Sequence, residues 1–257
     1  MFQCVIRHIY KHNLILFFIS VLSIQSCQYL DKKNESKSDS NKKDGSVKTF
    51  RKDGNLFSEI NYVNGRMHGI SKRYSKRGKL QFLDSYVDGI KNAKSLQFYP
   101  DGKVMRETSY MHGQKNGVTK AFWATGTLSS SITYREDLPA NDLKEFMKSG
   151  KEKKYETLLI QAIDELNTSG KYILKIKFSK NAKRADYYIG ELVDGKYFAE
   201  YELAKIPEKN GVGMLVFKPP PGGFIMKKYN IIGKLKTARG NILIRQKIYN
   251  LAIDRDS

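Results

Sequence analysis

The segment Tyr62-Val63-Asn64-Gly65-Arg66-Met67-His68-Gly69 returns 24 residues later, in altered form, from Tyr86, and again from Tyr110. Aromatic residues earlier in the unit keep the same spacing, and a glycine follows each of them after four residues. A fixed period of this length indicates a repeat architecture. The positions shared between copies are Phe50, Gly54, Tyr62, Gly65, Gly69, Tyr74, Gly78, Tyr86, Gly89, Phe98, Gly102, Tyr110, Gly113, Gly117, Phe122, Gly126 and Tyr134.

Each copy contains two turn signals separated by runs of strand length. Asp53-Gly54 marks one kind of turn, and Asn64-Gly65 marks the other. Asn-Gly and Asp-Gly favour tight hairpins, because type I′ turns need positive φ at both central residues. Between the turns, Leu56–Tyr62 alternates with the period of two that is typical of a strand. We therefore expect four hairpin repeats over residues 46–136, stacked into an elongated single-layer antiparallel sheet with aromatic ladders along one face.

The segments that start at Tyr62, Tyr86 and Tyr110 resemble the Tyr-x-Asn-Gly-Lys-x-x-Gly core of MORN repeats. Phe98–Val104 is similar to the Tyr-x-x-Asn-Gly-x-Leu half of the bacterial MORN-variant group. The resemblance covers about 90 of the 257 residues. It implies a scaffold, a lipid-proximal module or a protein-binding surface, and many members of the variant group are described as antitoxin-like or immunity-like. Two departures are Ala93, in the place of a repeat glycine, and Asp137, where the next turn glycine is expected, so we expect a capping copy that ends at Tyr134.

The first 26 residues have the features of an export signal. Arg7 and Lys11 precede the mostly apolar stretch Leu14–Ile24, which is short for a bilayer span, and the small Ser26 precedes Cys27. Residues 22–27 resemble a bacterial lipobox, which implies acylation of Cys27, with palmitate among the acyl groups, after cleavage. An ordinary secretory signal and an uncleaved anchor are the alternatives.

Cysteine usage is compatible with a lipoprotein. Cys4 lies inside the signal, so the cleaved protein would keep Cys27 alone and could form no internal disulfide or cysteine metal cluster. Two or three acyl chains make a firm membrane anchor. Gln28 follows Cys27, where Asp is associated with inner-membrane retention, so we expect the outer membrane of a bacterial cell envelope. The polar residues 27–45 predict a flexible tether.

The net charge of +20 implies attraction to anionic surfaces, or only solubility. Residues 46–136 carry 16 basic and 7 acidic side chains, and residues 150–257 carry 21 and 12. A nucleic-acid-binding protein usually concentrates its charge in one patch. The even spread therefore argues against a dedicated nucleic-acid site.

Residues 137–170 show helical patterns. Asp142 and Glu145 fit a capping box that ends at Gly150, which predicts a short helix over residues 143–149. A second, amphipathic helix is predicted by a stripe with helical spacing: Tyr155, Leu158, Leu159, Ala162, Ile163 and Leu166. We therefore expect a short helical connector between the repeats and the rest of the chain.

Residues 171–257 alternate with the period of strands and predict a C-terminal antiparallel domain that resembles a β-sandwich. The expected strands are 171–178, 187–192, 197–203, 214–217, 224–232 and 242–252, with a tight hairpin turn at Asp194-Gly195. The loop 218–223 contains three prolines. We interpret it as a rigid crossover, or as a polyproline segment offered to a partner.

Motifs for catalysis are missing from the sequence. His68 and His112 occupy turn positions, and the mature chain has no pair of histidines with metal-ligand spacing, no nucleophile elbow and no phosphate-binding glycine loop. We therefore predict no enzyme activity, no cofactor and no metal site.

The leading hypothesis is a lipid-anchored envelope protein that uses its repeat sheet as an interaction scaffold for another protein. The alternative is an immunity or antitoxin-like protein that neutralises a partner toxin, and an enzyme in the C-terminal domain is the least favoured. Specificity would lie in residues that break the period, such as Phe57, Arg73, Leu83, Arg106 and Trp123. Trp123 either closes the end of the array or is an exposed contact residue.

Overall fold

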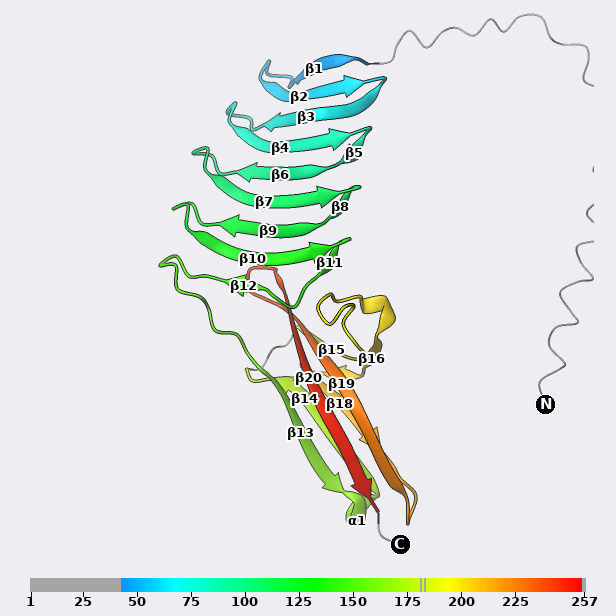
Figure 1. Cartoon of the computed structure of the whole chain (residues 1–257). Coiled ribbons are helices and arrows are strands. Elements are labelled where there is room, and N and C mark those ends of the chain that lie inside the picture. The colour runs from blue at the N-terminus through cyan, green and yellow to red at the C-terminus, as the bar shows by residue number, and fades with distance from the viewer. Residues whose placement is uncertain (1–42, 181, 183, 256–257) are drawn as a thin grey trace, which may run out of the picture. The chain divides into compact units, whose positions relative to one another are not determined.

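The computed structural model describes residues 43–180, 182 and 184–255 (Figure 1). Antiparallel sheet makes up most of this part of the chain, and the prediction of a mainly β fold with a long sheet of hairpins is confirmed. The predicted signal peptide, Cys27 and nearly all of the predicted tether lie outside the described residues. In the residues described, no helix is long and apolar enough to cross a membrane.

The first sheet, called the repeat sheet below, contains 12 strands that follow one another in chain order. Its main path is β1-β2-β3-β4-β6-β7-β9-β10-β11, with the short β5, β8 and β12 paired beside it. The strands are β1 (Gly45–Phe50), β2 (Leu56–Val63), β3 (Arg66–Tyr74), β4 (Leu80–Val87), β5 (Ile90–Lys91), β6 (Ala93–Phe98), β7 (Val104–Met111), β8 (Gln114–Lys115), β9 (Gly117–Phe122), β10 (Leu128–Arg135), β11 (Leu138–Pro139) and β12 (Lys144–Glu145).

Each repeat carries a β-bulge at its first aromatic residue. The register shifts at Phe50, Tyr74 and Phe98, and the same irregularity lies where Phe122 pairs with Leu128. A bulge bends its strand and increases the local twist. The 24-residue period therefore sets a regular bend in the backbone as well as the positions of the side chains.

The array continues beyond the predicted end at Tyr134. Phe146 and Gly150 extend the 24-residue spacing of Phe122 and Gly126. The Met147 amide donates to the Lys151 carbonyl at 2.8 Å, and the Gly150 amide donates to the Met147 carbonyl at 2.9 Å, as the corresponding amides do one repeat earlier. The chain thus forms the first half of a fifth repeat.

The predicted helix over residues 143–149 is consequently wrong. Lys144 and Glu145 form β12, which pairs with β10. The carboxylate of Asp142 accepts hydrogen bonds from the Thr133 amide at 3.0 Å and from Thr133 Oγ1 at 2.6 Å. Because Asp142 makes this contact across the sheet, it does not cap a helix.

The predicted amphipathic helix is also wrong, and the helical connector with it. Residues Leu158–Glu165 form strand β13, which pairs along its whole length with β14 (Lys171–Phe178). Only α1 (Leu166–Ser169) is α-helical here, and Gly170 ends it with a φ of 66°. A short apolar run fits the period of a helix as well as that of a strand. Here residues 158–165 pair with β14, whose residues favour strands, and this pairing outweighs the helical spacing of the apolar residues.

Two four-stranded sheets make up the rest of the chain, in the orders β13-β14-β18-β17 and β16-β15-β19-β20. The remaining strands are β15 (Ala185–Ile189), β16 (Ala204–Ile206), β17 (Glu208–Lys209), β18 (Val212–Phe217), β19 (Phe224–Lys236) and β20 (Ile242–Asp254). The predicted strand 197–203 is wrong, since a 3₁₀ turn, η1 (Glu200–Glu202), lies there. Phe198 packs edge-on against Tyr188 with ring centroids 5.3 Å apart, so this segment covers the sheet and does not extend it.

The two sheets share one core, as expected for a sandwich-like domain. Ile176 and Phe178 of β14 are fully buried together with Ile231 of β19 and Leu243 of β20. Ile132 of the repeat sheet joins the same cluster. Each such side chain contributes about 1.5–3 kcal/mol on burial, so this core also holds the end of the repeat sheet.

Candidate interaction surface

The hairpin turns of the repeat sheet are held by bonds between repeats. Both central residues of each turn have positive φ. The amide of the second turn residue donates to a carbonyl one repeat earlier: Gly65 to Lys43 at 3.0 Å, Gly89 to Met67 at 2.7 Å, Gly113 to Lys91 at 2.8 Å and Asp137 to Lys115 at 3.0 Å. Asp137 keeps this geometry with a φ of 65°, so the fourth copy has a complete turn. These repeat positions support the stacking of the hairpins.

A second set of bonds runs along the opposite edge. In three of the repeats, the residue after the bulge aromatic donates a side-chain hydrogen bond to the carbonyl of the aromatic residue one repeat later. Arg51 bonds to Tyr74 O at 2.7 Å, Tyr99 to Phe122 O at 2.8 Å and Trp123 to Phe146 O at 3.2 Å. The Arg239 guanidinium lies 4.5 Å from the Trp123 ring. Trp123 therefore contributes to closing the end of the array, as the first of its two interpretations expected.

The two faces of the repeat sheet differ. The tyrosine face, named for Tyr62, Tyr86, Tyr110 and Tyr134, carries lysines over its rings. Lys91 Nζ lies 4.7 Å from the Tyr110 ring centre, and Lys115 Nζ lies 4.8 Å from that of Tyr134. Between these ladders, small polar side chains such as Thr108 are buried. The tyrosine face is thus largely covered by its own side chains.

The other face, called the open face below, exposes large apolar side chains. The strand registers place on this face Val63, Ile70, Val87, Ile90, Met111 and Val118. Each is 40–50% exposed. In the described part of the first three repeats no apolar side chain is buried, since the first in the chain is Ile132. Here the sheet is a single layer whose open face has no cover from the described residues.

Charged side chains on the open face form pairs. Glu59 lies 3.4 Å from Lys72 and 4.0 Å from Lys48, and Glu107 lies 2.8 Å from Lys94. Ion pairs of this exposure contribute about 0–1 kcal/mol each. The open face is therefore a mixed surface, with apolar side chains among paired charges.

The residues that break the period do not come together. Arg73 and Arg106 lie on the tyrosine face, where Arg73 stacks 4.3 Å from the Phe82 ring centre. Leu83 and Phe57 lie on the open face. Trp123 takes part in the side-chain bonds along the edge opposite the hairpin turns. These residues are therefore divided between the two faces and one edge of the repeat sheet.

A buried carboxylate joins the repeat sheet to the C-terminal domain. Glu145 is fully buried, and its Oε1 accepts hydrogen bonds from Thr237 Oγ1 at 2.8 Å and Asn241 Nδ2 at 2.7 Å. Lys153 and Arg239 lie 3.7 and 4.0 Å from Oε2. The sequence patterns gave Glu145 a different role, as a helix cap. The continued spacing to Phe146 and Gly150 was the signal that could have placed it in the sheet.

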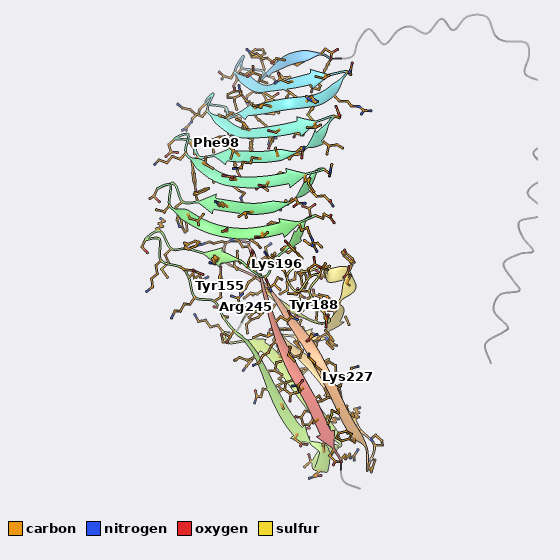
Figure 2. The ribbon with its side chains drawn as sticks, viewed as in Figure 1. Phe98, Tyr155, Tyr188, Lys196, Lys227 and Arg245 are labelled. Carbon is orange, nitrogen blue, oxygen red and sulfur yellow. The ribbon has the colours of Figure 1, made fainter. Side chains whose placement is uncertain are left out.

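Ionisable groups around this junction have shifted pKa values. Burial, reinforced by the nearby Glu145 carboxylate, raises the pKa of Tyr155, and burial lowers the pKa of Arg245, whose guanidinium lies 5.5 Å from the Tyr155 ring centre. Figure 2 labels both residues near the junction. Burial opposes ionisation of Asp142, but hydrogen bonds from Thr133 and the Lys196 ammonium outweigh it and lower the pKa of that carboxyl. These groups serve contacts within the fold.

His112 lies at a hairpin turn, as predicted, with a φ of 51°. The turn position predicted for His68 is wrong, since His68 lies within β3, where it is exposed and its Nδ1 is 3.5 Å from Asp88. Across the described residues, no group of three or more histidine, cysteine, aspartate or glutamate side chains is placed to hold a metal ion. The proline loop crosses from β18 to β19, and Arg255 fastens it through a bond of 2.7 Å to the Pro219 carbonyl.

The comparison with protein families supports the repeat assignment. The family model described as the MORN repeat variant matches residues 43–64, 67–88 and 91–112, three consecutive repeats. The chain is similar to that family over these residues, and the same hairpin geometry continues beyond them. A search of curated proteins found no match.

Proposed function

We propose that the protein is a non-enzymatic scaffold of the bacterial cell envelope, anchored by acyl chains on Cys27, whose repeat sheet binds a partner protein. The exposed apolar side chains of the open face carry this proposal. Large apolar side chains that are exposed together on one face of a protein, among polar groups, often mark an interaction site. The same pattern returns in successive repeats, which is how stacked repeats build an extended binding surface.

A protein suits this face better than a lipid does. Lys48, Lys72 and Lys94 are paired with Glu59 and Glu107 on the open face, so much of its positive charge is compensated. Attraction to anionic lipid needs an excess of free basic side chains. Interfaces between proteins combine apolar contacts with such polar groups.

A pull-down from detergent-solubilised membranes tests the proposal. Ile70 and Val118 are each replaced by glutamate in the full-length chain, and Leu159 and Val216, which are similarly exposed on the C-terminal domain, are replaced in the matched control. Retained folding is checked by thermal denaturation. Capture of a partner by the parent and the control, but not by the open-face variant, supports a scaffold. Equal capture by both variants contradicts it.

The immunity hypothesis is the second candidate, favoured by the strongly basic character of the chain, which would complement an acidic toxin. It differs from the scaffold hypothesis in the identity of the captured partner. A captured protein that is toxic when produced alone, and harmless when produced with this chain, would favour immunity.

A further inference from the structure

A pocket of about 310 Å³ lies between the segments that follow the bulge aromatics Tyr74 and Phe98, in the second and third repeats. These segments are at the edge of the repeat sheet opposite the hairpin turns. Its lining residues are Ser75, Lys76, Arg77, Lys79, Leu80, Gln81, Phe98, Tyr99 and Pro100. Figure 2 labels Phe98 at this edge of the sheet. The pocket, called the turn pocket below, is large enough for one bulky side chain or a small ligand.

Positive charge gathers at the turn pocket without acidic partners. Lys76, Arg77 and Lys79 are exposed, and none has a carboxylate within salt-bridge distance in the described part of the chain. Such cations attract anions over about 10 Å at moderate salt.

The equivalent turns of the first and third repeats have an acidic residue in place of Arg77. Asp53 and Asp101 occupy the position of Arg77, and their carboxylates accept the amides of Asn55 and Lys103 at 3.1 Å. At the turn pocket, Ser75 Oγ replaces that bond by accepting the Lys79 amide at 3.1 Å. The turn therefore keeps its shape while Arg77 is free to point a cation at a ligand.

The apolar wall of the pocket is fixed in position. Phe98 and Tyr99 are half-buried, and the Tyr99 hydroxyl is tied to the Phe122 carbonyl at 2.8 Å. Phe98 lies at the bulge, where its strand register is set by pairing with Val104. An apolar wall that is held in position beside exposed cations favours a ligand that has an apolar body next to negative charge.

We propose that the turn pocket binds a large apolar side chain from an acidic segment of the partner protein. The side chain would pack against Leu80, Phe98 and Tyr99, and flanking carboxylates would meet Lys76, Arg77 and Lys79. The partner's class follows from this charge complementarity. The inference rests on the proposed scaffold function and names the segment that such a partner presents.

Fluorescence anisotropy with the full-length protein and a labelled peptide, Asp-Glu-Phe-Glu-Asp, tests the inference. In one variant Lys76, Arg77 and Lys79 are replaced by glutamate. In the matched control Lys52, Lys148 and Lys151, on the first and fifth turns, are replaced, which changes the net charge equally. We expect about tenfold weaker binding for the pocket variant and less than about threefold for the control. A peptide with alanine for phenylalanine, and one with Asn and Gln for the acids, should each bind at least about fivefold more weakly.

Equal weakening by the two protein variants would show attraction by net charge alone and would overturn the turn pocket, as would no binding of the acidic peptide at millimolar concentration. Either result leaves the scaffold function standing if partner capture still depends on Ile70 and Val118. Loss of that dependence, with peptide binding intact, would instead remove the scaffold function and leave a peptide site.

Discussion

Thr237 Oγ1 donates a hydrogen bond of 2.8 Å to the buried carboxylate of Glu145, which lies 92 positions earlier in the chain. This contact ties the end of the repeat sheet to the turn between β19 and β20. Repeat arrays need a cap at each end, because a terminal repeat leaves one side uncovered. Here the C-terminal domain caps one end of the repeat sheet, with Glu145 at the centre of the contact.

Replacement of Glu145 by alanine should destabilise the protein by about 2–4 kcal/mol, because the Thr237 and Asn241 donors lose their buried acceptor. Chemical denaturation measures the loss. Replacement of the exposed neighbour Lys144 by alanine should change stability by no more than about 0.5 kcal/mol. If the two variants unfold alike, Glu145 does not hold the cap.

Replacement of Ala93 by glycine should stabilise the fold by about 0.5–1 kcal/mol. Ala93 has a φ of 63°, in the left-handed region, where Gly69 and Gly117 stand in the neighbouring repeats. The control is Ala121 to glycine, within β9, which should cost about 0.5–1 kcal/mol. Thermal denaturation compares the two, and a loss of stability in both would contradict the assigned backbone conformation.

Stability should fall as pH rises from 10 to 12, in part through Tyr187. Burial raises the pKa of this hydroxyl from 10.0 to about 12, and the hydroxyl donates to the Gly211 carbonyl at 2.7 Å. Because the folded protein holds the proton more tightly, the stabilisation is complete below pH 10 and is lost as pH approaches 12. Urea denaturation at pH 9, 10 and 11 should give a shallower decline for the Tyr187→Phe variant. Equal slopes for parent and variant would refute the assignment.

Replacement of Cys27 by alanine should abolish incorporation of radiolabelled palmitate and release the protein into the soluble fraction, since no thiol remains to be acylated. Replacement of Cys4, inside the predicted signal, should leave both labelling and membrane association unchanged. Labelling that persists without Cys27 would exclude the lipoprotein assignment.

Local chemistry made the repeats predictable from sequence. Asn64-Gly65 and its equivalents require positive φ and define a hairpin within a few residues. Residues 143–166 were not predictable in this way, because their apolar spacing suits both a helix and a strand, and distant partners decide between them. Asp142 bonds to Thr133, and Glu145 bonds to Thr237 and Asn241, so their roles depend on contacts that local patterns do not contain.

The exposure of the open face could likewise not be predicted from the sequence. Val63, Val87 and Met111 stand at equivalent positions, and an apolar residue with this period is equally compatible with packing against another layer and with binding a partner. Packing and binding are distinguished only by the strand registers, which place these residues on one face, and by the lack of a covering layer over the described repeats. The open face carries exposed apolar side chains among paired charges.

Photocrosslinking in intact cells tests the scaffold function most directly. A benzophenone amino acid is placed at Ile70 on the open face, and in a matched protein at Leu159 on the C-terminal domain, two positions of comparable exposure. Binding through the open face predicts one discrete crosslinked species from position 70 and none from position 159. No species from position 70, or the same species from both positions, would contradict the proposed function.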